Sequence, residues 1–224
     1  MANLAIIPAR GGSKRIPKKN IKKFLGKPII AYSIEVAKDI GLFDEIMVST
    51  DSREIADISR NYGAQIPFFR TKETANDFAP LNEVVKEVLE KYHQQGKSFD
   101  FVCLILPTAP LISSTNLEKG YRLLKSSKFD SVRPIVRFGF PIQRAFKLDK
   151  ANQVKPINPY DFMKRSQDLE PAYHDSGQFY WFRGDKDLST NKGAFEISEI
   201  EVQDIDNEID WKLAELKHNL LFKK

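Results

Sequence analysis

The residues best suited to chemistry lie near the N-terminus, where a glycine pair sits among five cations within eleven residues. An apolar stretch at 4–8 leads directly into this segment. Glycine backbone can turn its N–H groups toward an anion, and the surrounding Lys and Arg side chains suit a polyphosphate. The candidate anion-binding residues are Ala9, Arg10, Gly11, Gly12, Ser13, Lys14, Lys19 and Asn20. Their spacing matches neither the Walker A motif nor the dinucleotide fingerprint.

The excess positive charge of the chain is confined to this N-terminal segment. The 224 residues include 35 Lys and Arg against 30 Asp and Glu. Eight of the basic residues precede Glu35, which is the first acidic residue. The rest of the chain therefore has fewer basic than acidic residues, which argues against the extended basic face of a nucleic-acid-binding protein. We predict a local anion site and no nucleic-acid partner.

Two carboxylates near the C-terminus form the second candidate group. Asp204 and Asp206 are two residues apart, and in an extended segment their side chains point to the same side. Such a pair can share a hard cation, and a triphosphate brings Mg²⁺ with it. The alternative is that Asp206 and Glu208 stabilise the start of the final helix. We prefer the metal pair because a triphosphate site is predicted at the other end of the chain.

A third group of polar residues precedes an aromatic run at 179–182. Its His, Asp, Ser and Gln side chains suit hydrogen bonds to a polyhydroxylated substrate, and the alternative is a turn that enters a strand. The candidate substrate-binding residues here are Arg165, Tyr173, His174, Asp175 and Gln178. The single cysteine, Cys103, lies in an apolar run, which excludes a disulfide framework and favours a buried thiol.

Strand and helix patterns alternate along the chain and predict an α/β fold. The predicted strands are 4–8, 45–50, 65–69, 99–106, 131–136 and 179–182, with a further core segment at 199–202. Three of the predicted helices are 28–38, 82–95 and 208–220. A fourth is capped by Asp51 and reaches Tyr62, and a fifth begins with a capping box at Thr115 and reaches 126. This alternation implies a Rossmann-like, mostly parallel sheet with helices on both faces. Ligands bind beyond the carboxyl ends of such strands, where 10–20, Asp51 and 107–110 should converge.

One segment breaks this rhythm. Residues 137–170 contain three prolines and several aromatics without a helical period. We interpret the chain as a single domain, 1–224, in which 137–170 is an inserted extension that serves as a dimerisation arm. The sequence has no stretch of membrane-spanning length and no signal-like N-terminus, so we expect a cytoplasmic homodimer without a membrane partner.

The cationic segment also carries a resemblance to a known family. Residues 8–20 resemble the signature of the acylneuraminate cytidylyltransferases, which make CMP-activated nine-carbon sugar acids from CTP. Blocks at 24–35, 48–51, 106–111 and 202–206 are similar to further family motifs, as is Arg70 with Glu73, Ala75 and Asp77, so the resemblance covers nearly the whole chain. It implies a nucleotidyltransferase fold, CTP as substrate, and Mg²⁺ at Asp204 and Asp206. It also implies that the anion-binding residues, together with Asp51, hold the nucleotide, with Asn20 on the cytidine.

The acceptor is suggested by one branch of this family. Segments 165–169 and 173–179 look most like the pseudaminic acid cytidylyltransferases. Leu106 stands where the family has a glutamine, and apolar residues near Leu81 replace polar ones. Lost polar groups would leave sialic acid hydroxyls unpaired, which suits a less hydroxylated acceptor. CMP-sialate and CMP-legionaminate synthesis are the alternatives within the class, and a non-catalytic nucleotide- or sugar-binding protein is the alternative outside it.

The expected reaction is nucleotidyl transfer, in which the anomeric hydroxyl of the sugar acid attacks the α-phosphorus of CTP and pyrophosphate leaves. Such chemistry needs mainly alignment and charge neutralisation. The residues expected to carry it are Arg10, Lys14, Lys19, Asp204 and Asp206. Arg70 is a cation suited to the sugar carboxylate, and Leu81 and Leu106 are expected to border the sugar.

Overall fold

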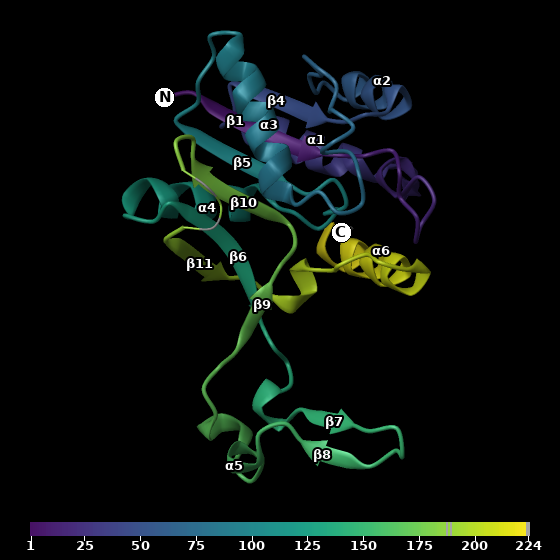
Figure 1. Cartoon of the computed structure of the whole chain (residues 1–224), viewed down its shortest axis with the longest axis vertical. Helices are drawn as coiled ribbons and strands as arrows, with labels where there is room; N and C mark the ends of the chain where they lie inside the picture. The colour runs from purple at the N-terminus through teal and green to yellow at the C-terminus, as the bar shows by residue number, and fades with distance from the viewer. Residues whose placement is uncertain (187, 189, 223–224) are drawn as a thin grey trace.

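One mixed sheet carries the fold of this chain in the computed structural model, which describes residues 1–186, 188 and 190–222 (Figure 1). Its strands occur in the order β11-β6-β10-β5-β1-β4, and β9 pairs with β6. Their bounds are β1 Asn3–Pro8, β4 Glu45–Ser49, β5 Phe101–Ile105, β6 Ser131–Arg137, β9 Tyr173–Asp175, β10 Phe179–Arg183 and β11 Lys192–Glu196.

The strand directions agree with the predicted, mostly parallel sheet. β1 pairs in parallel with β4 and β5, and β11 pairs in parallel with β6. β10 runs antiparallel between β5 and β6, and β9 runs antiparallel to β6. β1 and β5 are buried along their whole length because helices cover both faces of the sheet, which explains their continuous apolar sequence.

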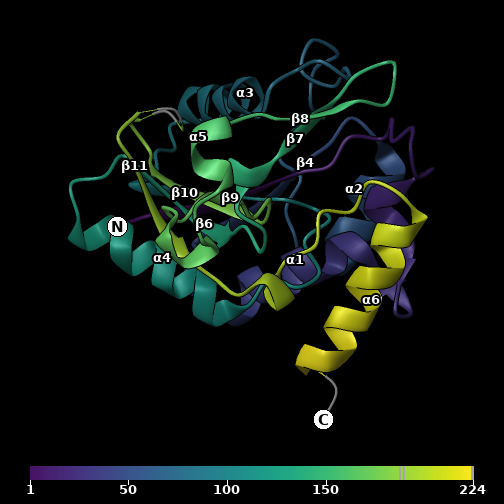
Figure 2. The same cartoon turned by 90° about the horizontal axis from the view of Figure 1, so that it is seen from below.

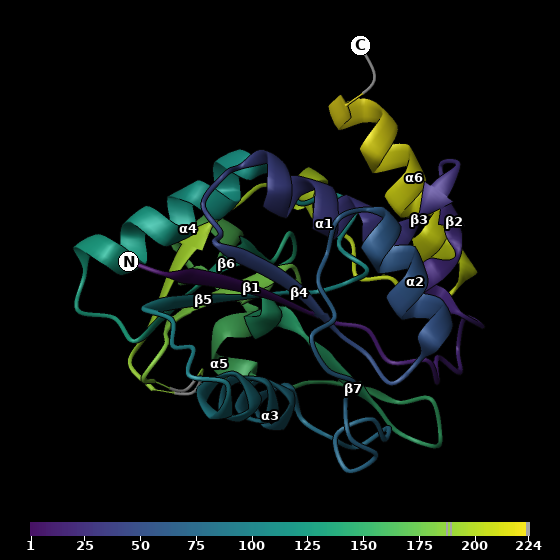
Figure 3. The same ribbon diagram turned by 90° about the horizontal axis from the view of Figure 1, so that it is seen from above.

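Helices pack on both faces of the sheet (Figure 3). α1 (Ile29–Asp39), α2 (Arg53–Asn61) and α4 (Ser114–Ser126) bury apolar side chains in the core on one face. α3 (Leu81–Gln94) covers the other face through Val85, Val88 and Tyr92. Among the described residues, no helix is both long and apolar enough to cross a membrane.

The last helix, α6 (Glu208–Phe222), lies on the α1 side of the molecule (Figure 2). It packs against the small hairpin of β2 (Lys23–Phe24) and β3 (Lys27–Pro28). We call residues 10–20 the cationic loop. One buried cluster contains Trp211 of α6, Phe24 of the hairpin and Ile16 of this loop. This cluster joins the N-terminal loop and hairpin to the C-terminal helix.

Two predicted helix caps are wrong. Ser52, and not Asp51, caps α2, and its hydroxyl accepts a hydrogen bond from the Ile55 N–H at 3.4 Å. The carboxylate of Asp51 instead accepts the Gly11 N–H, so a contact 40 residues away decides between two adjacent cap formers. α4 likewise begins earlier than the box predicted at Thr115, because the Ser113 hydroxyl accepts from the Asn116 N–H.

The predicted strand at 65–69 is also wrong. Only Gln65 forms a bridge, with Met47, and Pro67 has no N–H with which to continue a ladder. The predicted core segment at 199–202 buries Val202 but forms a 3₁₀ turn, η4 (Glu199–Glu201). The sequence pattern missed β11, an edge strand that alternates buried and exposed residues.

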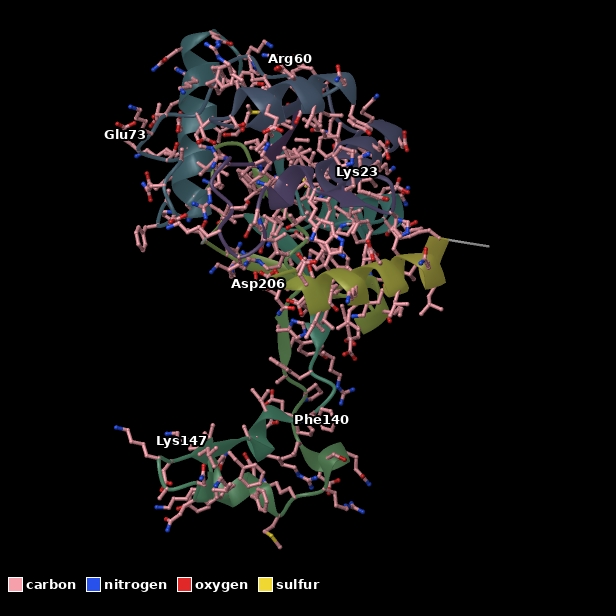
Figure 4. The ribbon with its side chains drawn as sticks, turned by 90° about the vertical axis from the view of Figure 1, so that its right-hand side faces the viewer. Lys23, Arg60, Glu73, Phe140, Lys147 and Asp206 are labelled. Atoms are coloured by element: carbon pink, nitrogen blue, oxygen red, sulfur yellow. The ribbon has the colours of Figure 1, made fainter. Side chains whose placement is uncertain are left out.

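A segment projects from the core between β6 and β9 (Figures 1 and 4). It contains the hairpin β7 (Phe146–Leu148) with β8 (Val154–Pro156), the short helix α5 (Pro159–Phe162), and two 3₁₀ turns, η2 (Ile142–Arg144) and η3 (Ser166–Asp168). Large apolar side chains on it are exposed: Phe140 at 89%, Tyr160 at 91% and Met163 at 86%. The predicted extension is 137–170, but Arg137 ends β6 and β9 begins at Tyr173, so we call residues 138–172 the arm.

Candidate functional site

The cationic loop follows β1 and is fixed at both of its ends. Ile16 is buried in the cluster with Phe24 and Trp211, so the residues around it cannot drift from the core. The amide of Asn20, itself buried, donates to the Arg10 carbonyl at 3.0 Å, and the Asp51 carboxylate accepts the Gly11 N–H at 2.8 Å. These contacts give a segment without regular structure a defined path.

Of the two glycines, Gly11 is the one that passes close to the start of α2. A Cβ on Gly11 would lie 3.2 Å from the Ser52 Cβ, closer than most such contacts allow. The loop then turns tightly, because the Ser13 N–H donates to the Gly11 carbonyl at 3.1 Å. Glycine at position 11 therefore allows the backbone to pass close to α2.

The loop encloses a cavity of about 230 Å³ at the carboxyl end of β1. Arg70, whose side chain contacts Ser49 at the end of β4, and Leu81, at the start of α3, complete its wall from elsewhere in the chain. The lining residues are Pro8, Arg10, Ser13, Lys14, Arg15, Ile16, Lys19, Asn20, Arg70 and Leu81. The structure thus brings most of the predicted anion-binding residues together with two of the predicted substrate-binding residues.

The loop cations are paired with carboxylates from distant segments. Arg10 and Lys14 both contact the Asp77 carboxylate. Arg15 and Lys19 both pair with Asp206, at 2.5 Å and 3.8 Å. Each of these pairs is a place where an incoming anion competes with a protein carboxylate for the same cation.

Lys19 is the most buried cation of the loop. Its ammonium group donates to the Ile205 carbonyl as well as facing Asp206. Burial lowers the pKa of Lys19 from 10.5, although the nearby carboxylates of Asp206 and Asp204 act in the opposite direction. Lys19 therefore joins the N-terminal loop to the acidic segment near the C-terminus.

Asp206 lies just before α6, at the base of the core (Figure 4), and does not cap that helix. Asn207 is the cap, since its side-chain oxygen accepts the N–H groups of Ile209 and Asp210 at 2.8 Å and 3.1 Å. Asp210 reciprocates by accepting the Asn207 N–H at 3.0 Å, and Glu208 pairs with Lys22 at 2.5 Å. Of the alternative, Glu208 does lie in the first turn of α6, where its charge favours the helix start, but Asp206 is not the cap and pairs with Arg15 and Lys19 of the loop.

The donor set at Asp204 and Asp206 fits Mg²⁺. Ile205 between them is buried, which anchors the segment, while Asp204 is exposed and Asp206 is partly exposed. Both carboxylates act on Lys19 of the loop. Among the described residues there is no group of three or more His, Cys, Asp or Glu that could hold a metal ion. An ion here would need oxygen ligands from a nucleotide as well, as Mg²⁺ commonly does in nucleotide sites.

Arg70 is a buried cation at the rear of the cavity. Its Nε donates to the Ser49 hydroxyl at 3.0 Å and its Nη2 to the Ser49 carbonyl at 2.7 Å. Burial lowers its pKa to about 10, and the charge of Asp51 partly offsets this effect. The guanidinium is held by the end of β4 and lines the cavity.

The remaining predicted substrate-binding residues lie around β9 and β10. Asp175 is a structural hub, because its carboxylate accepts the Gly177 N–H at 2.8 Å and the Tyr180 hydroxyl at 3.0 Å and pairs with Arg133 at 3.2 Å. The sequence pattern missed Tyr180 and Arg133 in this network. Tyr180 is partly buried, and the pKa of its hydroxyl is raised by desolvation and by Asp175.

Gln178 and Leu106 are neighbours at the strand ends, where the Leu106 N–H donates to the Gln178 carbonyl at 2.8 Å. Gln178 is 3% exposed, and its Oε1 has no hydrogen-bond partner among the described residues. The His174 ring packs on Phe138 with centroids 4.9 Å apart, and Tyr173 is exposed beside it on β9.

Arg165 lies on the arm, where it pairs with Asp168 at 2.8 Å. It is not among the residues that line the cavity of its own chain.

The fold and the cavity define the class of protein. A sheet of this order with a cationic loop after its first strand is the frame of a nucleotidyltransferase, and the comparisons with known proteins agree. A CMP:2-keto-3-deoxy-manno-octonic acid synthetase solved in complex with CTP has the same fold, with a TM-score of 0.70 and 16% sequence identity over 96% of this chain and 98% of that one.

Residues 4–214 match the family model described as cytidylyltransferase, and the chain belongs to that family. It is 41% identical to the pseudaminic acid cytidylyltransferase of Campylobacter jejuni over 98% of this chain and 97% of that protein. It is 34% identical to the CMP-N,N'-diacetyllegionaminic acid synthase of Legionella pneumophila, over 96% and 95% of the two chains. The predicted family membership and fold are confirmed, and the chain is a nucleotidyltransferase.

Proposed function

We propose that this enzyme transfers the cytidylyl group of CTP to a nonulosonic acid, with pseudaminic acid as the preferred acceptor, and releases pyrophosphate. One observation carries the proposal: in this cytidylyltransferase, Arg10, Lys14 and Lys19 of the N-terminal loop and the distant Arg70 line the same cavity. With Arg15, five cations line one cavity, which suits two anionic substrates, a nucleotide triphosphate and a sugar acid.

The N-terminal loop binds the triphosphate. Arg10, Lys14 and Lys19 neutralise the phosphate oxygens and the charge that develops on departing pyrophosphate. The Gly12 N–H adds a neutral donor. Asn20, whose amide is buried against the loop, contacts the cytidine side of the nucleotide. The protein thus contributes alignment and charge, with no covalent step of its own.

Asp204 and Asp206 would hold Mg²⁺ together with phosphate oxygens, and when bound the ion neutralises phosphate charge and orients the nucleotide. The chain's own contribution is the position of these carboxylates. Lys19 donates to the Ile205 carbonyl between them, so the cation that meets the phosphates also holds the acidic segment in place.

Arg70 binds the carboxylate of the sugar acid, because it lines the cavity as a cation that Ser49 holds in position. Leu81 and Leu106 give the acceptor apolar surroundings. A polyhydroxylated sialic acid would leave hydroxyl groups unpaired against them, whereas a deoxy sugar acid loses less. The 41% identity to a pseudaminic acid cytidylyltransferase supports the same acceptor.

We also propose that the single domain 1–224 acts as a homodimer in the cytoplasm and that the arm is its dimerisation element. The arm exposes Phe140, Tyr160 and Met163 almost completely, an arrangement typical of a surface that a partner covers. The exposed Arg165 of the arm, with the β9 residues Tyr173 and His174, then faces the acceptor side of a neighbouring subunit.

An acceptor panel tests the proposal. Initial rates of pyrophosphate release are measured with CTP, Mg²⁺ and each of pseudaminic, legionaminic and sialic acid. We expect kcat/KM to be highest for pseudaminic acid. A higher kcat/KM for sialic acid would overturn the choice of acceptor, and no release with any of the three would overturn the activity.

A further inference from the structure

The two cations that bracket the glycine pair are already matched by a carboxylate of the chain. Arg10 Nη1 contacts one oxygen of Asp77, and Lys14 Nζ contacts the other. As an ordinary carboxyl, Asp77 is ionised at neutral pH, and hydrogen bonds from Lys14 and Arg10 lower its pKa further. Asp77 thus offers two anionic oxygens to the groups that would bind phosphate.

The segment that carries Asp77 is held by contacts of its own. At its root, the Thr71 N–H donates to a carboxylate oxygen of Glu87 on α3 at 2.9 Å. Near its tip, the Asn76 amide donates to the Glu73 carbonyl at 2.6 Å, and the Phe78 N–H donates to Asn76 Oδ1 at 2.8 Å. The segment therefore does not depend on the cation pairs for its path, and the Asp77 side chain can leave them by rotation.

We propose that Asp77 is a displaceable counter-ion of the triphosphate site: it neutralises Arg10 and Lys14 in the empty enzyme, yields them to CTP, and returns as pyrophosphate leaves. The inference rests on the proposed function for the identity of the nucleotide. Asp77 competes with every ligand of these two cations. The competition lowers affinity most for ligands that must contact both cations at once. Triphosphate and pyrophosphate are such ligands, whereas the single phosphate of CMP is not.

The competition has a use in the reaction cycle. Pyrophosphate held by several cations at once would dissociate slowly, and product release limits the turnover of many enzymes. A carboxylate already tethered beside the site lowers the affinity for pyrophosphate without any conformational change of the fold. Asp77 thereby exchanges some affinity for CTP for faster release of the product.

The test is isothermal titration of CTP, pyrophosphate and CMP, each with Mg²⁺, into wild-type protein and Asp77→Asn. The control variant is Asp57→Asn, which removes the same charge from an exposed pair with Arg60 on α2. Because two partly exposed ion pairs are lost in Asp77→Asn, we expect Kd to fall roughly 3- to 30-fold for CTP and pyrophosphate. We expect Kd for CMP to stay within about twofold and the control to match wild type. A thermal melt of each variant establishes that it is folded.

Unchanged or weaker binding of CTP and pyrophosphate by Asp77→Asn would overturn the proposal, since weaker binding would make Asp77 a ligand contact. An equal fall in Kd for CTP, pyrophosphate and CMP would overturn the proposal as well, because it would reflect only the change in the overall charge of the protein. No acceptor sugar is present, so turnover does not enter the measurement. An enzyme that binds CTP but forms no CMP-sugar would refute the proposed function, while these affinities would still decide the role of Asp77.

Discussion

The substitution Asp206→Asn separates the chemistry of the site from its stability. Asn has the same shape but no charge, so the variant loses the ion pairs with Arg15 and Lys19. The cap of α6 survives, because Asn207 and Asp210 form it. The Asp206 side chain is 39% exposed, which places these pairs among surface ion pairs, each worth about 0.2–1 kcal/mol.

The expected losses differ in size. For a chain of this length, about 1 kcal/mol corresponds to a Tm change of roughly 2–4 °C, so the melting temperature should fall by only a few degrees. Loss of an electrostatic contact to the reacting groups lowers the rate by about 10²–10³-fold, which is about 2.7–4 kcal/mol in the barrier. The effect on activity should therefore exceed the effect on stability severalfold.

The assay is pyrophosphate release at saturating CTP over a range of Mg²⁺ concentrations, with a thermal melt of each variant. Glu208→Gln is the matched control. Glu208 lies two residues from Asp206, and the substitution removes the same charge from an exposed ion pair with Lys22. We expect the control to keep its rate and Mg²⁺ requirement, and Asp206→Asn to lose rate and need more Mg²⁺. If the two variants were equally active, the role given to Asp206 would be refuted.

Three further predictions follow from the same structure. Burial lowers the pKa of Lys19 below 10.5, so its positive charge is lost as pH rises through that lowered value and KM for CTP should rise in the alkaline range. Lys19→Arg should move this rise in KM to higher pH, and an identical pH profile of the two proteins would contradict the role given to Lys19. Gly184→Ala would place a Cβ 1.8 Å from the Phe99 carbonyl oxygen, and a denaturant melt should show a free energy of unfolding lower by about 1–3 kcal/mol. At the control position the nearest atom to a Cβ is 3.7 Å away, so Gly139→Ala should be as stable as wild type. Phe140→Asp on the arm should convert a dimer to a monomer in light scattering, and an unchanged mass would count against the arm as the interface.

Local sequence patterns predicted the frame of the site well. β1 is a continuous apolar run and the loop cations follow it directly, so their placement at a strand end needed no distant information. The main helices and strands of the sheet were predictable for the same reason. The loop itself also carried the motif by which its family could be named.

Distant contacts explain what the sequence patterns missed. Asp51 and Ser52 are equally good cap formers, and only the position of the Gly11 N–H decides which of them is used. The pairing of Asp77 with Arg10 depends on the path of a segment without periodicity, which no local pattern encodes. β11 was missed because an edge strand with one exposed face has a weak apolar signal.

The most direct test of the central claim is product identification by chromatography and mass spectrometry after incubation with CTP, Mg²⁺ and pseudaminic acid. The account predicts a CMP-linked sugar acid and pyrophosphate in equal amounts, with no product when CTP or the sugar acid is omitted. Bound but unconverted CTP, or hydrolysis of CTP without a CMP-linked sugar, would contradict it.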